Sequence, residues 1–397
     1  MRLVTDYLDD IVRQYPEKIA FANEQDSMTF AQVQESARKV AVGLGKKDVF
    51  KQPVAVFMEK SPACITSFLG VAYSGNFYTP IDTKMPVSRI QKIIETLSPA
   101  VVITNRHLLS SAKQIFDGYD ILIYEELEAG IDDYEILASV KLKQQDTDLL
   151  YVLFTSGSTG IPKGVTISQQ AVIDYIEWIT AAFSFDNHTV FGNQSPLYFD
   201  VSLQDIYVPL KMGATTYLIE QEKFSFPIRL LEYLKEKHVN TIFWVPSALI
   251  LVANLKALGR VNLPDLENVL FAGEVMPNKQ LNMWRKTFPQ AKFANLYGPT
   301  EITEICTYYK VNREFKDEES LPMGRACENM EVFILDEDDK LVMDNAIGEL
   351  CVRGRGLSYG YYNNPQKTAE VFVQNPLQPH YPEIIYRTGD LVRYNEF

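Results

Sequence analysis

Cysteine and histidine are both scarce in this chain of 397 residues, with four of each. The cysteines, Cys64, Cys306, Cys327 and Cys351, stand far apart and form no C-x-x-C pair. Their spacing therefore predicts neither a disulfide framework nor a zinc site, and buried free thiols in a reducing compartment are the simpler interpretation. The histidines are equally scattered, so a transition-metal site built by the protein is not expected.

The sequence also lacks long apolar runs and an excess of positive charge. No run approaches the about 20 apolar residues that span a bilayer, and acidic residues follow Met1 almost at once, so we expect no secretory signal, no membrane partner and a cytoplasmic location. Lys and Arg number 38 against 51 Asp and Glu, a net charge of −13, which repels nucleic acid. A polyanionic ligand would have to be held locally, by backbone N–H groups, one or two cations and a metal ion.

What is present is an ordinary globular composition. Hydrophobic residues make up 46% and charged residues 22%, values that argue against a disordered, collagen-like or coiled-coil protein. Because domains average about 100–200 residues, the length suggests two or three structural units.

Strand and helix patterns alternate through most of the chain, which predicts an α/β fold with mainly parallel sheets. After about residue 325 the pattern changes to runs at 330–335 and 348–353, separated by an acidic turn at 336–339, so a smaller β-rich unit is expected there. The expected inner strands lie at 54–57, 77–82, 101–104, 149–154, 241–245 and 268–271, and the expected helices at 61–75, 88–97 and after Ser168.

The segment TSGSTGIPKG, residues 155–164, directly follows an apolar run. Its glycines allow tight turns and close approach of a ligand, its hydroxyls and N–H groups are donors, and Lys163 supplies a cation. These are the groups that a triphosphate requires, although the pattern is not a Walker motif. A solvated linker is the alternative, but linkers seldom adjoin a buried strand and carry an embedded Pro-Lys-Gly.

The segment YVLFTSGSTGIPKGV resembles the phosphate-loop signature of the adenylate-forming superfamily, which includes the adenylation domains of nonribosomal peptide synthetases, acyl- and aryl-CoA synthetases and firefly luciferase. Further motifs follow in the family's order over essentially the whole chain. They lie at 77–82, at 295–301 (NLYGPTE), from Gly348 to Thr368, and at 386–391 (YRTGDL).

The resemblance implies a nucleotide site. Thr155, Ser156, Thr159 and Lys163 would bind the β- and γ-phosphates of ATP, and Thr300 would contact the α-phosphate region. Glu301 would hold Mg²⁺, which suits a hard carboxylate oxygen. Tyr297 would stack on adenine, Asn295 would read its amino edge, and Asp390 would accept from both ribose hydroxyls. The remaining implied nucleotide-binding residues are Gly157, Ser158, Gly160, Ala272, Gly273, Glu274, Leu296 and Gly298.

The resemblance also implies the domain organisation: an adenylation core over 1–397, with two layered α/β subdomains to about residue 325 and a β-barrel-like subdomain over about 326–397. The family's mobile C-terminal domain carries a lysine that grips the attacking carboxylate and the α-phosphate. Since the sequence ends soon after Asp390, we expect that domain to be absent and adenylate formation to be slow. Because the pattern starts close to Met1, we expect a stand-alone enzyme or a first module.

The segment PLYFDVS, residues 196–202, resembles the family segment that opens the acyl pocket. Asp200 stands where amino-acid-activating members have an aspartate that pairs with the substrate ammonium, although a helix N-cap is an alternative role. A buried Glu304 would require a hydroxyl, an amine or a cation on the substrate, unless it points to solvent. The implied pocket residues are Phe199, Asp200, Val201, Gln204, Ser247, Leu270, Ala272, Leu296, Glu304 and Ile305.

The resemblance therefore predicts an acid–AMP ligase that uses ATP and Mg²⁺ and passes its product to the phosphopantetheine of a carrier protein, in trans or downstream. The acid would be an α-amino acid or an anthranilate-type amino aryl acid. Two alternatives are an acyl- or aryl-CoA synthetase of the same superfamily and a non-catalytic adenylate-binding module. Intact Lys163, Glu301 and Asp390 argue against the second alternative.

Overall fold

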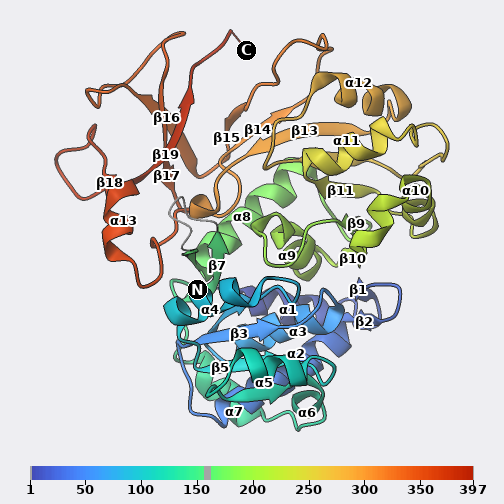
Figure 1. Cartoon of the computed structure of the whole chain (residues 1–397), viewed down its shortest axis with the longest axis vertical. Helices are drawn as coiled ribbons and strands as arrows, with labels where there is room; N and C mark the ends of the chain where they lie inside the picture. Colours follow the sequence, from blue (N-terminus) through green and yellow to red (C-terminus); the bar gives the residue numbers. More distant parts are fainter. Residues whose placement is uncertain (1, 156–161, 397) are drawn as a thin grey trace.

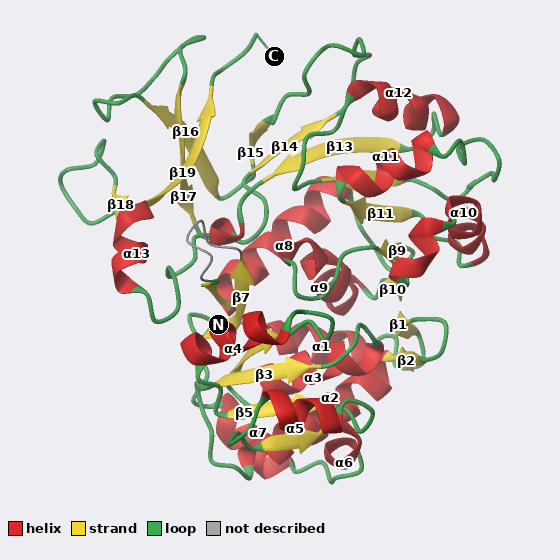
Figure 2. Cartoon of the chain, in the orientation of Figure 1, coloured by secondary structure: helices red, strands yellow, loops and turns green. Residues whose placement is uncertain are grey.

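The computed structural model describes residues 2–155 and 162–396, and three β-sheets organise these ranges (Figure 1). Two sheets are mainly parallel and are separated by a shared layer of helices, and the third is antiparallel (Figure 2). The structure thus has the mixed α/β architecture that the alternating patterns predicted.

The first sheet has six strands in the order β6-β5-β3-β4-β7-β8. Its strands are parallel except for β8, which pairs with β7 as an antiparallel hairpin. Strand β3 is buried along its whole length, as expected for an inner strand covered by helices on both faces. The strands are β3 (Pro53–Phe57), β4 (Phe77–Pro80), β5 (Val101–Thr104), β6 (Ile121–Ile123), β7 (Leu149–Thr155) and β8 (Lys163–Ser168).

The second sheet has nine strands in the order β15-β14-β13-β12-β11-β9-β10-β1-β2. Strand β1 pairs in parallel with β10, so a segment near the start of the chain joins a sheet built mainly from residues beyond 190. The strands are β1 (Ile19–Ala22), β2 (Ser27–Thr29), β9 (Val190–Asn193), β10 (Thr215–Leu218), β11 (Thr241–Trp244), β12 (Asn268–Phe271), β13 (Lys292–Tyr297), β14 (Thr307–Lys310) and β15 (Arg325–Ala326).

Five helices lie between the two mainly parallel sheets and share one apolar core with both of them. They are α1 (Val4–Val12), α2 (Phe30–Gly45), α3 (Pro62–Tyr73), α8 (Gln169–Phe183) and α9 (Leu203–Met212). Helices α4 (Val87–Leu97) and α5 (Leu109–Ile115) cover the outer face of the first sheet. Helices α10 (Pro227–Glu236), α11 (Pro246–Asn254) and α12 (Asn278–Thr287) cover that of the second. The short helices α6 (Tyr124–Glu128) and α7 (Tyr134–Lys141) contact α2, and the remaining turns are η1 (Asp200–Ser202), η2 (Gln221–Ser225) and η3 (Thr300–Ile302).

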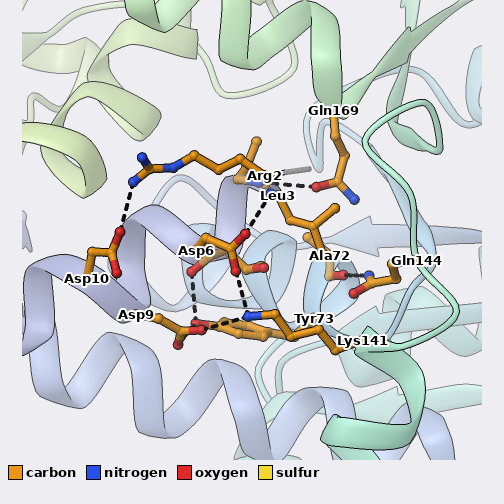
Figure 3. Close-up of polar contacts among 12 residues, drawn as sticks. Arg2, Leu3, Asp6, Asp9, Asp10, Ala72, Tyr73, Lys141, Gln144 and Gln169 are labelled. Atoms are coloured by element: carbon orange, nitrogen blue, oxygen red, sulfur yellow. Dashed lines mark hydrogen bonds and ion pairs between the residues drawn. The ribbon is translucent and has the colours of Figure 1, made fainter.

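Helix α1 ties the central layer together by polar contacts (Figure 3). The Tyr73 hydroxyl, on α3, donates to Asp9 at 2.7 Å, and the Lys141 ammonium, on α7, donates to Asp6 at 2.5 Å. The backbone N–H of Val4 donates to Oε1 of Gln169, at the start of α8, at 3.2 Å. One short helix is therefore fixed to elements of both α/β halves.

The third sheet has four antiparallel strands in the order β16-β17-β19-β18. It docks on the first sheet through residues 360–362: the Thr166 N–H donates to the Gly360 carbonyl at 3.1 Å, and the Tyr362 N–H donates to that of Gly164 at 2.7 Å. We propose the predicted division near residue 325 as the boundary of this unit. Its elements are β16 (Met330–Leu335), β17 (Gly348–Gly354), α13 (Pro365–Val371), β18 (Phe372–Gln374) and β19 (Ile384–Val392).

Local expectations agree with the structure where the chain is described. Ser168 caps α8 by accepting from the Ala171 N–H at 3.2 Å, and the chain leaves α3 through Gly75 at φ +73°. All four cysteines are buried and unpaired, as predicted. Within the described ranges, every helix is too short or too polar to cross a bilayer.

Candidate active site

The β7–β8 hairpin carries the glycine-rich segment. Thr155, the last residue of β7, pairs with Lys163, the first residue of β8, so the segment connects two adjacent strand ends. Five residues assigned to nucleotide binding lie outside the described residues: Ser156, Gly157, Ser158, Thr159 and Gly160.

Lys163 meets a buried carboxylate and a tyrosine hydroxyl. Its ammonium lies 3.7 Å from Oε1 of Glu301, on η3, and donates to the Tyr361 hydroxyl at 3.1 Å. That hydroxyl in turn donates to the same Glu301 oxygen at 2.7 Å. Burial, and then the Glu301 carboxylate, raises the pKa of Tyr361, so its hydroxyl stays protonated and available as a donor. The hairpin, η3 and the segment before α13 therefore meet at one point.

Glu301 has the chemistry of a magnesium ligand, because Mg²⁺ prefers oxygen donors and is usually bound by one or two carboxylates together with substrate phosphates. Its side chain is largely buried, which limits competition from bulk water. Among the described residues, no three acidic, histidine or cysteine side chains gather into a metal site of their own. Glu301 is thus suited to a Mg²⁺ ion whose other oxygen ligands include the phosphates of a bound nucleotide.

Tyr297 and Asp390, assigned to adenine and ribose, meet across two sheets. Tyr297 ends β13, Asp390 lies in β19, and the Tyr297 hydroxyl donates to Oδ2 of Asp390. Burial, and then this contact, raises the pKa of Tyr297. Asn295, two residues earlier on β13, donates its amide N–H to the Pro322 carbonyl at 2.9 Å. The Asn295 amide thus binds a backbone carbonyl 27 residues further along the chain, whereas Tyr297 and Asp390 contact each other.

The turn between β13 and β14 is tight and strained. A Cβ on Gly298 would lie 2.2 Å from the Glu304 carbonyl oxygen, so only glycine fits there without movement. Thr303 and Glu304 have φ values of +59° and +77°, in the left-handed region that costs energy for residues with a side chain. The turn holds Glu301 beside Lys163 and places Glu304 in the interior.

Asp200 and Glu304, both predicted to bind the acid, lie near one another. Asp200 starts η1 and accepts from the Val201 N–H at 2.9 Å, while Ser202, not Asp200, is the N-cap residue of α9. Burial raises the pKa of Asp200, and a hydrogen bond from the Thr300 side chain partly offsets this. Glu304 is 2% exposed, which excludes the solvent-facing alternative. Burial, and then the charge of Asp200, raises the pKa of Glu304 well above its usual range.

Apolar side chains line the same part of the core. Leu270, Ala272, Leu296 and Ile305 are buried in one cluster, and Val201 packs against it. Gln204 is fully buried: its amide donates to the Val201 carbonyl at 2.7 Å and accepts from the Tyr175 hydroxyl at 3.1 Å. These residues come from β12 and the residue after it, β13, η1, α9 and the β13–β14 turn.

Two predicted pocket residues, Phe199 and Ser247, are exposed rather than buried. Phe199 is 53% exposed, and its ring lies 4.9 Å from that of Tyr198. Ser247 is exposed on a cavity of about 1650 Å³, and its N–H donates to Glu274 at 2.8 Å. Gly273, at φ +90°, turns the chain from β12 toward Glu274.

Three further residues near the site, Tyr361, Tyr175 and Asp205, have no role in the sequence predictions. Tyr361 lies within the motif from Gly348 to Thr368, so this motif could have marked it as a candidate site residue. Tyr175 and Asp205 are buried on α8 and α9, where only the folded structure brings them to Glu304.

Comparisons with known proteins agree with this geometry. Residues 8–362 match the family model described as AMP-binding enzyme. The chain is 32% identical over 380 residues to the D-alanine--D-alanyl carrier protein ligase of Bacillus velezensis, covering 94% of this chain and 73% of that protein. It is 31% identical over 389 residues to tyrocidine synthase 3 of Brevibacillus parabrevis, but this covers 97% of the chain and only 6% of that protein.

Among solved structures, the nonribosomal peptide synthetase FmoA3 superposes with a TM-score of 0.87 at 24% identity, covering 99% of this chain and 41% of that one. This likeness establishes the fold of an adenylation core with a smaller β unit. The chain belongs to the AMP-binding enzyme family, the group of adenylate-forming ligases that its motifs predicted.

Proposed function

We propose that the protein uses ATP to activate an amino-bearing carboxylic acid as its acyl-adenylate, releasing pyrophosphate, and that the acyl group then passes to the phosphopantetheine thiol of a carrier protein. The similarity to a D-alanyl carrier protein ligase and to a peptide synthase supports both steps. The substrate would be an α-amino acid or an anthranilate-type acid.

The observation that carries this proposal is the contact between the two halves of the site. The Thr300 side chain lies near enough to Asp200 to lower the pKa of that carboxyl, and the next residue, Glu301, lies beside Lys163. An acid whose ammonium pairs with Asp200 would therefore sit next to the groups assigned to the nucleotide's phosphates. Positioning of this kind is the main catalytic requirement when two anions must react.

In the proposed reaction, a carboxylate oxygen of the acid attacks the α-phosphorus, and the bond from that phosphorus to the bridging oxygen of pyrophosphate breaks. The leaving pyrophosphate keeps the bonding electrons, so negative charge grows on its oxygens. Lys163 would stabilise that charge from the hairpin, and a bound Mg²⁺ would neutralise part of it. Glu301 would hold the ion, while Tyr361 keeps the Glu301 carboxylate oriented.

The nucleoside would be bound between the second and third sheets. Tyr297 offers a ring for adenine stacking, and Asp390 offers two carboxylate oxygens to ribose hydroxyls. Because these two side chains already touch, ribose binding would exchange the Tyr297 hydroxyl for sugar hydroxyls at Asp390.

The test is ATP–pyrophosphate exchange with a panel of amino acids and aminobenzoates, for the native protein and Asp200→Asn. We expect exchange with an amino-bearing acid to fall at least about tenfold in Asp200→Asn, since a buried ion pair loses one partner, while the Kd of ATP stays unchanged. Asp117→Asn, which changes an exposed aspartate, is the matched control. Normal activation by Asp200→Asn would remove the ammonium-anchor role. Transfer of the activated group to coenzyme A rather than to a carrier would instead favour the CoA synthetase alternative.

A further inference from the structure

Three carboxyl groups lie close together among the predicted acyl-pocket residues: Asp205 and Glu304 are buried, and Asp200 is partly exposed. Asp200 and Asp205 each have partners within the described chain. Asp200 accepts from the Val201 N–H and contacts Thr300. Asp205 accepts from the Asn193 amide at 2.7 Å, and the positive charge of Lys60 acts on it, since the Lys60 ammonium donates to Oδ1 of Asn193 at 3.0 Å.

Glu304 has neither kind of partner. In residues 2–155 and 162–396, no donor satisfies either of its carboxylate oxygens. Tyr175 lies beside it and partly offsets the rise of the Glu304 pKa, but the single proton of the Tyr175 hydroxyl is donated to Oε1 of Gln204 at 3.1 Å. The other titratable groups that act on Glu304 are Asp200 and Asp205, both of which repel its charge. A buried carboxylate without a donor or a cation costs several kcal/mol, so such groups are rare in folded proteins unless a ligand uses them.

The backbone keeps Glu304 in this unfavourable place. Thr303 and Glu304 are both in the left-handed region, and the Thr303 hydroxyl is fixed by donating to the Gly356 carbonyl at 2.7 Å. On the other side of the turn, Gly298 packs directly against the Glu304 carbonyl. A strained turn that holds an unpaired carboxyl group in the interior is typical of a binding site rather than of a stabilising element.

The groups around Glu304 indicate which substrate group would bind there. If the α-ammonium of the acid pairs with Asp200, as proposed above, the Glu304 carboxyl still has no donor or cation beside it, and a cation bound there would stabilise its ionised form. An apolar substrate side chain would leave it unpaired, and a hydroxyl would supply one hydrogen bond without neutralising it. A second cation on the substrate would do both, and the apolar walls at Leu270, Leu296 and Ile305 suit the methylene groups that carry it.

Resting on the proposed function, we infer that the activated acid is an amino acid whose side chain bears a second cationic nitrogen, an ammonium or a guanidinium, and that Glu304 binds it. This role makes Glu304 the residue that selects basic side chains. It disfavours the anthranilate-type alternative, because an aminobenzoate has no second cation.

The experiment compares three hydrolysis-resistant aminoacyl sulfamoyl adenosines that differ only at the end of the side chain: ornithyl, 5-hydroxynorvalyl and norvalyl. Their Kd values are measured by calorimetry for the 397-residue chain, for Glu304→Gln, and for Glu337→Gln, which changes an exposed glutamate. We expect the ornithyl compound to bind the native chain at least about a hundredfold more tightly than the norvalyl compound, the range found when a buried charge pair is complete. In Glu304→Gln this preference should fall to within about tenfold, while Glu337→Gln keeps it.

Each outcome has a distinct meaning. Tight binding of all three compounds without a preference would overturn the inference and leave the proposed function intact. A preference for the hydroxynorvalyl compound would overturn it in favour of a hydroxyl-bearing acid. Failure of all three to bind, while ATP still binds, would contradict the proposed amino-acid function itself. Thermal unfolding of Glu304→Gln, with and without ATP, shows whether that variant is folded.

Discussion

The Tyr361 hydroxyl connects Glu301 to Lys163: it donates to Oε1 of Glu301 at 2.7 Å and accepts from the Lys163 ammonium at 3.1 Å. The lysine and the carboxylate themselves are 3.7 Å apart. The hydroxyl thus lies between the lysine and Oε1 of the carboxylate, and the Tyr386 side chain also lies against Glu301. If Glu301 holds Mg²⁺, Tyr361 acts on the ion through Glu301 as a positioning residue.

Replacing Tyr361 with phenylalanine tests this arrangement. Without the hydroxyl, Glu301 loses its orienting donor and Lys163 is free to pair with it directly, so the carboxylate should bind Mg²⁺ less well. Loss of such an orienting partner typically costs about 10–100-fold in metal affinity. We therefore expect the Mg²⁺ concentration for half-maximal ATP–pyrophosphate exchange to rise about tenfold, with partial recovery of the rate at high Mg²⁺.

Tyr362→Phe is the control for this prediction, because Tyr362 is the adjacent tyrosine and contacts β8 through its backbone N–H. It should leave the Mg²⁺ dependence unchanged. A Tyr361→Phe protein that loses activity equally at every Mg²⁺ concentration would show a merely structural role for the hydroxyl.

The unpaired carboxyl of Glu304 predicts an unusual pH dependence of stability. Its pKa is raised in the folded state, by burial first and then by Asp200, so above pH about 4.5 the folded protein retains a proton that the unfolded chain has lost. The free energy of unfolding therefore falls as pH rises through this window. Asp200 and Asp205 add to the same trend, because burial raises both pKa values, that of Asp205 to about 7.

In Glu304→Gln the contribution of Glu304 is absent. We expect the ligand-free variant to gain stability relative to the native protein as pH rises from 5 to 7.5, measured as the difference in free energy of unfolding from urea titrations. Tyr175 and Tyr151, which also face Glu304, have raised pKa values and stay neutral in this range, and the pKa of Lys60, lowered by burial to about 8, lies above it. A difference that stays constant with pH, or that shrinks, would mean that Glu304 is paired in solution.

The sequence predicts the scaffold well because the scaffold is built from local patterns. The apolar run at 54–57 and the capped helix after Ser168 are visible in any short window, and their alternation implies parallel sheets. The pairing of β1 with β10 was not visible, because partners so distant in sequence leave no local signal. The contact of Lys163 with Tyr361 spans 198 residues and was hidden for the same reason.

The interior position of Glu304 illustrates a different limit. Burial of an unpaired glutamate contradicts every local preference, and positive φ angles at Thr303 and Glu304 are expected for glycine or asparagine rather than for these residues. Sequence patterns could identify the turn by its motif but could not choose between the interior and the solvent for the Glu304 side chain. Sites that break local rules in this way are where prediction from sequence is expected to fail.

Gly298 provides a test of the turn that carries both Glu301 and Glu304. In Gly298→Ala the new methyl group would start 2.2 Å from the Glu304 carbonyl oxygen and 2.7 Å from Cα of Ile305, both backbone atoms that cannot move as a side chain can. Overpacking of this kind costs about 1–3 kcal/mol, so we expect the free energy of unfolding to fall by that amount. Because the displaced segment includes Glu304, the selectivity between ornithyl and norvalyl adenylate analogues should fall as well.

Gly118→Ala is the control for this prediction. Gly118 has φ +81° but open space around its Cβ position, so the variant should lose only about 1 kcal/mol from backbone strain and keep the selectivity. Equal stability loss in the two variants, with selectivity intact in both, would show that the turn adapts and does not fix Glu304.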